Sequence, residues 1–301
     1  MILFRAHLKR NKSNNLRISK MKNIIKNTIA ILAVAISLVS CSNNDTTTPV
    51  DELVGISKFT EITNTTHTIE LYSHMSVEQG YNEIKIRIKD NSTNEYVKNA
   101  VVNWTPLMHM AMMTHSCPKS DVGKTTADGT LYEGYIVFQM AQNDTEYWDL
   151  KIDYSIDGTS YTATTRIDVP ASTERNVNTF TGSDGIKYIV AYAEPHHPKV
   201  ALNDMVVGVF KMQDMMNFPV VDGYTLKIDP RMPSMGNHSS PNNVNPTQIL
   251  AGDLYSGKMA MTMTGYWKIN LQLVNPNGDV VKGEEISDTV LESSIYFDFE
   301  L

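Results

Sequence analysis

The sequence predicts an all-β protein built from two tandem immunoglobulin-like β-sandwich domains. The first observation is a series of short runs in which apolar and polar residues alternate, as from Trp148 to Tyr154. The second is that turn pairs such as Asp157-Gly158 and Asn277-Gly278 follow these runs, as is typical of β-hairpins. The third is an internal repeat, which indicates that one sandwich occurs twice.

The repeat consists of matching features in the same order. The pairs are His115 and His238, Leu131-Tyr132 and Leu254-Tyr255, and Tyr147-Trp148 and Tyr266-Trp267. The histidine and the leucine are 16 positions apart in each copy. We therefore expect the first sandwich at 56–172 and the second at 173–301, with Trp148 and Trp267 at equivalent core positions.

The N-terminal segment predicts a lipid anchor. Lys22 and Lys26 precede an apolar run at 29–39 that is too short to span a bilayer. The run ends in Leu38-Val39-Ser40-Cys41, which resembles the bacterial lipobox, in which the cysteine thiol carries the lipid. We therefore expect a lipoprotein signal peptide at 21–41, with either Met1 or Met21 as the start.

The polar segment 42–55 is expected to be a flexible linker. The mature protein would begin at Cys41 and be held by its lipid to a membrane of the bacterial cell envelope, facing the periplasm or the cell surface. Which membrane and leaflet hold the lipid stays open.

Composition excludes some classes of function. A net charge of −7 argues against nucleic acid as a partner. The sequence has no Gly-x-Ser-x-Gly, no His-Glu-x-x-His and no phosphate-binding loop, so we expect no enzyme. With Cys41 lipidated, Cys117 is the only thiol and cannot form an intramolecular disulfide. Cys117 is then either a buried inert thiol or a ligand for a soft metal.

Two loops combine methionine and histidine. Both contain Met-x-x-His-x-x-Pro, the first at Met112/His115/Pro118 and the second at Met235/His238/Pro241. Thioether sulfur and imidazole nitrogen together suit a soft metal, above all Cu(I), whereas zinc prefers thiolate, imidazole and carboxylate. The alternative is that the methionines fill gaps in a core. The polar neighbours of the second loop favour the metal.

The candidate metal ligands form two sets. The better site is expected to consist of Met232, Met235 and His238, with His196 or His197 as an added ligand. The first copy would use Met108, His109, Met112 and His115, with Cys117 in reserve. Met259, Met261 and Met263 correspond to Ile136, Phe138 and Met140, so we interpret them as core packing. Because imidazole binds a metal in its neutral form, affinity should fall below about pH 6.5.

Residues 224–273 resemble the YtkA-like domain family, relatives of FixH-like and copper-handling periplasmic proteins. The resemblance rests on Met232-Pro233-Ser234-Met235-Gly236, Gly252-Asp253-Leu254-Tyr255 and Gly265-Tyr266-Trp267. Asn237 stands where the family has a histidine, and His238 follows one position later. The first copy matches more loosely. The resemblance implies an immunoglobulin-like sandwich and a link to copper.

Two hypotheses of function remain. The first is an envelope lipoprotein that binds Cu(I) through its Met/His loops and sequesters copper or transfers it to an envelope partner. The second is a non-catalytic binding or scaffold lipoprotein that contacts an envelope partner or a glycan without metal. The first requires that methionine and histidine side chains converge at one end of a sandwich.

Overall fold

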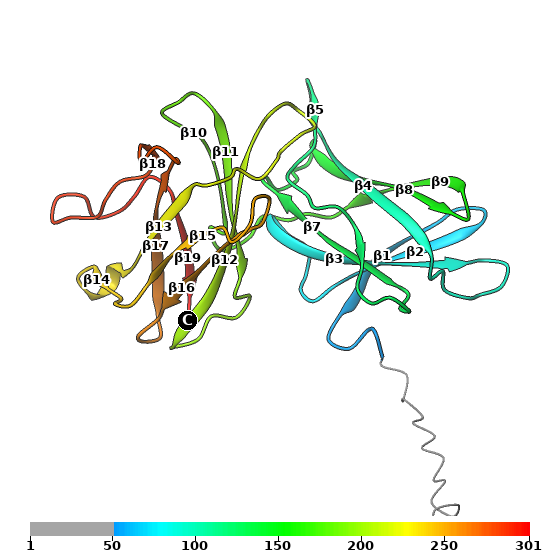
Figure 1. Ribbon diagram of the computed structural model, residues 1–301, viewed down its shortest axis with the longest axis horizontal. Coiled ribbons are helices and arrows are strands. Elements are labelled where there is room, and N and C mark those ends of the chain that lie inside the picture. Colours follow the sequence, from blue (N-terminus) through cyan, green and yellow to red (C-terminus); the bar gives the residue numbers. More distant parts are fainter. Residues whose placement is uncertain (1–50) are drawn as a thin grey trace, which may run out of the picture. The chain divides into compact units, whose positions relative to one another are not determined.

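The computed structural model describes residues 51–301 and confirms the prediction of an all-β protein (Figure 1). All sheets are antiparallel, and residues 51–301 contain no α-helix. In that part of the chain no helix has the length and apolar character needed to cross a membrane. The expected signal peptide, Cys41 and residues 42–50 of the linker lie outside the described residues.

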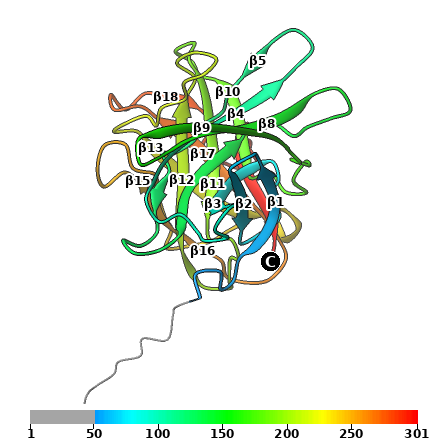
Figure 2. The same ribbon diagram turned by 90° about the vertical axis from the view of Figure 1, so that its right-hand side faces the viewer.

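Two sheets are built from the residues before 168. The first has the order β1 (Ser57–Thr63), β2 (His67–Ser73), β3 (Gly80–Asp90), β7 (Leu131–Phe138) and β6 (Gly123–Lys124). The second has the order β5 (Thr114–His115), β4 (Ala100–His109), β8 (Tyr147–Ile156) and β9 (Thr159–Ile167). The strands β4, β8 and β9 form one layer, and β1, β2 and β3 form another (Figures 1 and 2).

Two further sheets are built from the residues after 176. One has the order β10 (Val177–Thr181), β11 (Lys187–Glu194), β12 (Leu202–Lys211), β16 (Tyr255–Ala260) and β15 (Val244–Thr247). The other has the order β14 (His238–Ser239), β13 (Thr225–Met232), β17 (Tyr266–Val274) and β18 (Val280–Lys282), and β19 (Tyr296–Glu300) also pairs with β17.

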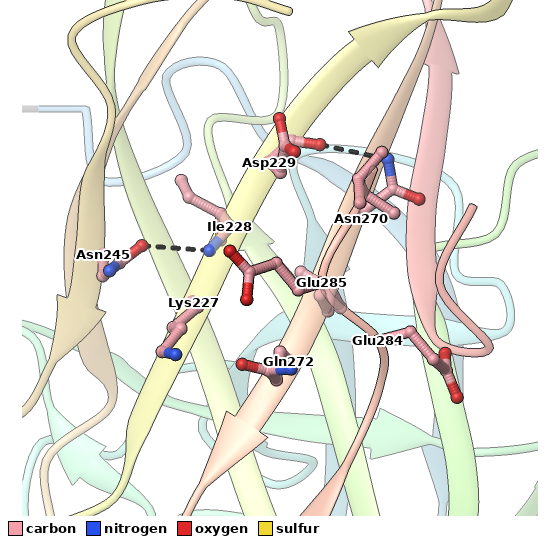
Figure 3. A pocket seen from close by; sticks show the side chains of 10 residues that line it. Lys227, Ile228, Asp229, Asn245, Asn270, Gln272, Glu284 and Glu285 are labelled. Carbon is pink, nitrogen blue, oxygen red and sulfur yellow. Dashed lines mark hydrogen bonds between the residues drawn. The ribbon is translucent and has the colours of Figure 1, made fainter. Parts of the chain in front are cut away.

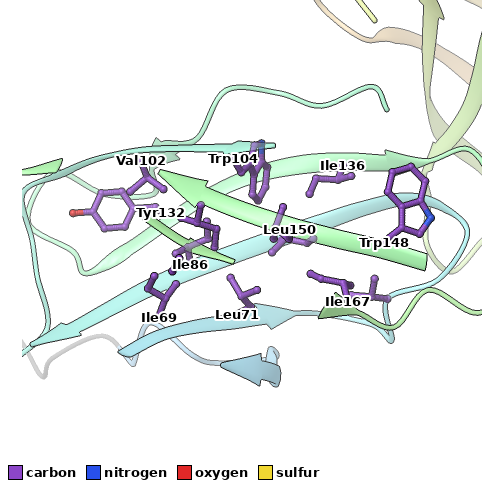
Figure 4. Packing of buried hydrophobic residues seen from close by; sticks show 14 of the residues in the cluster. Ile69, Leu71, Ile86, Val102, Trp104, Tyr132, Ile136, Trp148, Leu150 and Ile167 are labelled. Atoms are coloured by element: carbon purple, nitrogen blue, oxygen red, sulfur yellow. The ribbon is translucent and has the colours of Figure 1, made fainter. Parts of the chain in front are cut away.

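Strand alternation builds a separate core in each pair of sheets. Ile84, Ile86 and Ile88 on β3 are fully buried, whereas the residues between them are only partly buried. They pack with Trp104 of β4 and Trp148 of β8 in one cluster between the two sheets (Figure 4). Burial of such side chains contributes roughly 1.5–3 kcal/mol each, so this alternation drives the pairing of the two layers.

The second core contains Trp267 and two of the three methionines expected to be packing. Met259 and Met261 are buried in this cluster, as predicted. Met263 is 37% exposed, so the prediction that it packs in the core is wrong. The strand β16 ends at Ala260, and alternation no longer governs the residues beyond it.

Trp148 and Trp267 occupy corresponding places in their sheets. Each is the second residue of its strand, β8 or β17, and each side chain is fully buried, with a relative exposure of 0%. The indole Nε1 of Trp148 donates a hydrogen bond to the Met140 carbonyl, and that of Trp267 donates to the Met263 carbonyl, both at 3.0 Å. The two indoles are thus anchored in the same way.

A third apolar cluster joins the two pairs of sheets. It contains Val137 of β7, Ile189 and Ala191 of β11, Phe210 of β12, and Phe218. These residues lie on strands from both pairs of sheets, and residues 52–301 form one compact unit. The cluster therefore places Met110 and Met113 of the first Met/His loop near Met212 and Met215, which come about a hundred positions later in the sequence.

Candidate metal site

Both Met/His loops begin as short hairpins in which a methionine faces a histidine. The β4–β5 ladder pairs Met108 with His115, and the β13–β14 ladder pairs Met232 with His238. Residues directly opposite on antiparallel strands have Cβ atoms about 5 Å apart and share a face. The structure thus brings each of these two predicted pairs together.

The two buried methionines of these pairs belong to the cores. Met108 is 0% exposed and Met232 is 2% exposed, and each is packed in its own cluster. The Met232 methyl lies against Gly265, where an added Cβ would come within 2.9 Å of Met232 Cε. Gly265 also has a φ of +125°, which side-chain-bearing residues rarely adopt. The sequence pattern around Met232 therefore serves close packing.

The second loop presents its remaining candidates to solvent. Pro233–Met235 forms a 3₁₀ turn that ends at Gly236 and Asn237, both with positive φ. Asn237 Nδ2 donates a hydrogen bond to the Leu291 carbonyl at 3.0 Å. Met235 is 57% exposed and His238 is exposed as well. The second loop therefore has two possible metal ligands on its surface, Met235 and His238, whereas Met232 is buried.

His196, one of the two histidines expected to join the second loop, lines a different hollow. His196 and His74 line one small hollow of about 110 Å³, whose lining residues include none from Pro233–His238. His196 Nε2 lies 3.3 Å from Glu194 Oε1, and His74 Nε2 lies 3.9 Å from Glu83 Oε1. Each imidazole thus has a carboxylate neighbour, and His197 is exposed.

The first loop, by contrast, borders a cavity of about 450 Å³ that is rich in sulfur. Its methionines are Met110, Met113, Met140, Met212 and Met215. The other lining residues are His115, Gln139, Thr179, Lys187, Ile189 and Phe218. Met110 and Met113 come from the first loop, whereas Met212 and Met215 come from the segment between β12 and β13. Thioethers from both pairs of sheets therefore surround one space.

Backbone hydrogen bonds hold the two segments in place. Met110 N donates to the Met113 carbonyl at 2.9 Å and closes the tip of the first loop. Ser116 N donates to the Met215 carbonyl at 2.8 Å, which ties the first loop to the later segment. Asp214 Oδ1 accepts from the backbone N–H of Met216 at 2.7 Å and so shapes the turn that carries Met215.

His115 is the histidine that lines the cavity. Its Nδ1 lies 2.6 Å from the Ser116 carbonyl oxygen, which can only accept, so Nδ1 carries a proton. In neutral imidazole the lone pair is then on Nε2, the atom that can ligate a metal. The ring is 8% exposed and packs edge-on against Trp148, with 5.9 Å between centroids. His115 is therefore oriented by its own backbone and by a core tryptophan.

Polar atoms near the cavity remain unpaired. Gln139 Oε1 and Ser116 Oγ are both buried, and neither has a hydrogen-bond partner among residues 51–301. Gln139 lines the cavity, and its Nε2 lies 3.3 Å from the Ser116 carbonyl. An unpaired buried acceptor usually has a ligand, an ion or a water as its partner. This observation is independent of the methionines and fits a cavity that accepts a guest.

Four candidates of the first copy do not line the cavity: Met108, which is packed in the first core, and His109, Met112 and Cys117. His109 stacks on Tyr147 on the other face of β4, and its Nε2 is 3.0 Å from Asp149 Oδ2. Met112 is at the tip of the loop and is 92% exposed. Cys117 is buried in the first core, and burial raises its thiol pKa well above the ordinary value. A neutral thiol in an apolar core is a poor metal ligand, so the inert alternative for Cys117 fits its position.

Sequence reasoning did not single out any of the five methionines that line the cavity. The repeat directed attention to residues with a counterpart in the other copy, such as Met112 and Met235. The available signal was the density of methionine in 108–113 and again in 212–216. What joins these segments is the contact between the two pairs of sheets, which alternation within one strand does not reveal.

The part of the chain from 51 to 301 contains no group of three or more histidine, cysteine, aspartate or glutamate side chains arranged to hold a metal ion. A site for a soft metal in this part of the chain would therefore depend on thioether sulfur. The sequence matches no model of a known protein family and no curated protein.

Proposed function

We propose that the protein binds Cu(I) in the methionine-lined cavity. The observation that supports this proposal is that five methionines and His115 line one space of about 450 Å³. Thioethers are neutral and polarizable, and Cu(I) is the soft metal for which they are most selective. Binding needs no thiolate, so an inert Cys117 is consistent with it.

The residues present fit a monovalent cation. The donors are neutral, so no buried negative charge is left behind when the metal leaves. Lys187 also lines the cavity, but this residue is exposed, and its flexible chain allows the ammonium to stay in water. When bound, Cu(I) would supply a soft cation for storage or transfer. We infer no redox or hydrolytic reaction.

The biological setting of the proposal comes from the sequence. A lipid on Cys41 would hold the protein at a membrane of the envelope, with residues 42–55 as the tether. There it would sequester Cu(I) or pass it to an envelope partner. The resemblance of residues 224–273 to YtkA-like domains is a prediction from sequence that concerns the second loop, and none of these residues lines the cavity.

The test is an equilibrium competition on the soluble form, residues 42–301, with a chromogenic Cu(I) chelator under reducing conditions. We expect one Cu(I) per chain to be withdrawn from the chelator. Zn(II) at equal concentration should not displace it, because thioether contributes little to zinc. Failure to compete for Cu(I), or equal competition by Zn(II), would refute the proposal.

A scaffold or glycan-binding lipoprotein remains the second candidate because of a polar hollow of about 260 Å³ on the second pair of sheets. Lys227, Gln272 and Glu285 border it (Figure 3). However, Asn245 Oδ1 already accepts from Ile228 N at 3.0 Å, and Asn270 Nδ2 donates to the Asp229 carbonyl at 3.1 Å. These amides fasten the strands, which leaves fewer groups for a ligand and makes copper the better supported function.

A further inference from the structure

Four methionines are exposed on two turns beside the cavity. Met112 is 92% exposed, Met113 46%, and Met215 and Met216 are each 42% exposed. We name these four residues the methionine rim. Met113 and Met215 also line the cavity, so their side chains are open both to solvent and to the proposed metal site.

The rim belongs to two ordered turns that touch. The Ser116 N–H donates to the Met215 carbonyl at 2.8 Å, which joins them. On the later turn, Asp214 Oδ1 accepts from the backbone N–H groups of Met216 and Asn217, and its Oδ2 accepts from Asn217 Nδ2 at 2.6 Å. The side-chain hydrogen bond from Asn217, followed by the backbone hydrogen bonds, lowers the pKa of Asp214. The Asp214 carboxylate therefore stays ionised, and holds the turn, well below neutral pH.

Folding does not account for methionine at these positions. Turn tips favour glycine, asparagine, aspartate, serine and proline, each for a backbone reason. Met112 and Met216 are exposed and belong to none of the three apolar clusters of residues 51–301. What they share with the cavity is thioether sulfur.

We propose that the methionine rim is the entry and exit route for Cu(I), at which the ion is taken from, or given to, a carrier that holds it through soft ligands. This inference rests on the proposed function. On loading, one Cu–S bond to a rim thioether forms while one bond to the carrier breaks, and on release the rim bond breaks while a bond to the carrier forms. The ion remains Cu(I) throughout. No proton is released, because a thioether carries none.

The experiment compares rates with equilibria. Residues 42–301 are mixed in a stopped-flow instrument with the Cu(I)–bicinchoninate complex, and the loss of the complex's absorbance gives the loading rate. The variant M112L/M216L removes the two rim thioethers that do not line the cavity and keeps similar volume. We expect loading to slow about tenfold, which corresponds to about 1.4 kcal/mol on the barrier, while the equilibrium affinity is unchanged.

The control is Met75→Leu. Met75 is 47% exposed and borders the small hollow lined by His74 and His196, away from the methionine rim. The loading rate of this variant should equal that of the parent. A parent-like rate in M112L/M216L would overturn the route. A lower equilibrium affinity in that variant would also overturn it, because the rim would then be part of the site. The proposed function is tested by the equilibrium measurement and not by the rate. It fails if the parent takes no Cu(I) from the chelator at equilibrium.

Discussion

The double variant M113L/M215L should bind Cu(I) at least about 100-fold more weakly than the parent, a loss of about 2.7 kcal/mol. These residues bring thioethers to the cavity from the two segments joined by the Ser116–Met215 hydrogen bond. Leucine has no donor for Cu(I) but has nearly the volume of methionine, so each substitution should cost less than about 1.5 kcal/mol of stability. The measurement is the chelator competition on parent and variant.

The matched control for this prediction is M235L/H238N in the second loop. Met235 and His238 are exposed and were the favoured ligands from sequence. Their removal should leave the Cu(I) affinity near that of the parent. If M235L/H238N abolishes binding while M113L/M215L binds as tightly as the parent, the surface loop is the site and the cavity is not.

Trp148→Ala should reduce the free energy of unfolding by about 3–5 kcal/mol. The indole is fully buried, packs against Phe138 with 5.0 Å between ring centroids, and donates to the Met140 carbonyl. Alanine would leave a cavity and an unpaired carbonyl. Urea unfolding followed by circular dichroism measures the change.

Trp267→Ala is the informative partner of this variant. We expect a similar loss of stability, because Trp267 is also fully buried and bonded to a backbone carbonyl. Only Trp148 contacts His115, however, so only Trp148→Ala should weaken Cu(I) binding by chains that remain folded. A loss of less than 1 kcal/mol in either variant, or equal effects of both on Cu(I), would contradict this account.

The sequence predicts the strands and their buried faces well because alternation is a local property. The run from Ile84 to Ile88 is buried at every second residue, and Trp148 and Trp267 lie in the cores. Alternation stops being informative where a strand ends. Met261 and Met263 both lie past the end of β16, and Met261 is buried whereas Met263 is 37% exposed.

The candidate site was only partly predictable. The residue types and the first loop were indicated by sequence, and His115 does line the cavity. The preference for the second loop arose from polar neighbours, which in the structure accompany surface exposure of Met235. Met212 and Met215 could not be assigned, because their proximity to His115 depends on the third cluster, whose residues are far apart in the chain.

The most direct test of the central claim is a Cu(I) titration of residues 42–301 with ¹³C-labelled methionine methyl groups, followed by NMR. Residues 42–301 contain 15 of the chain's 17 methionines, since Met1 and Met21 precede them, and the five around the cavity should respond first. We predict that the methyl signals of Met110, Met113, Met140, Met212 and Met215 shift by the first equivalent, while that of Met235 does not. A shift confined to Met235, with the five cavity signals unmoved, would contradict the claim that the cavity binds the metal.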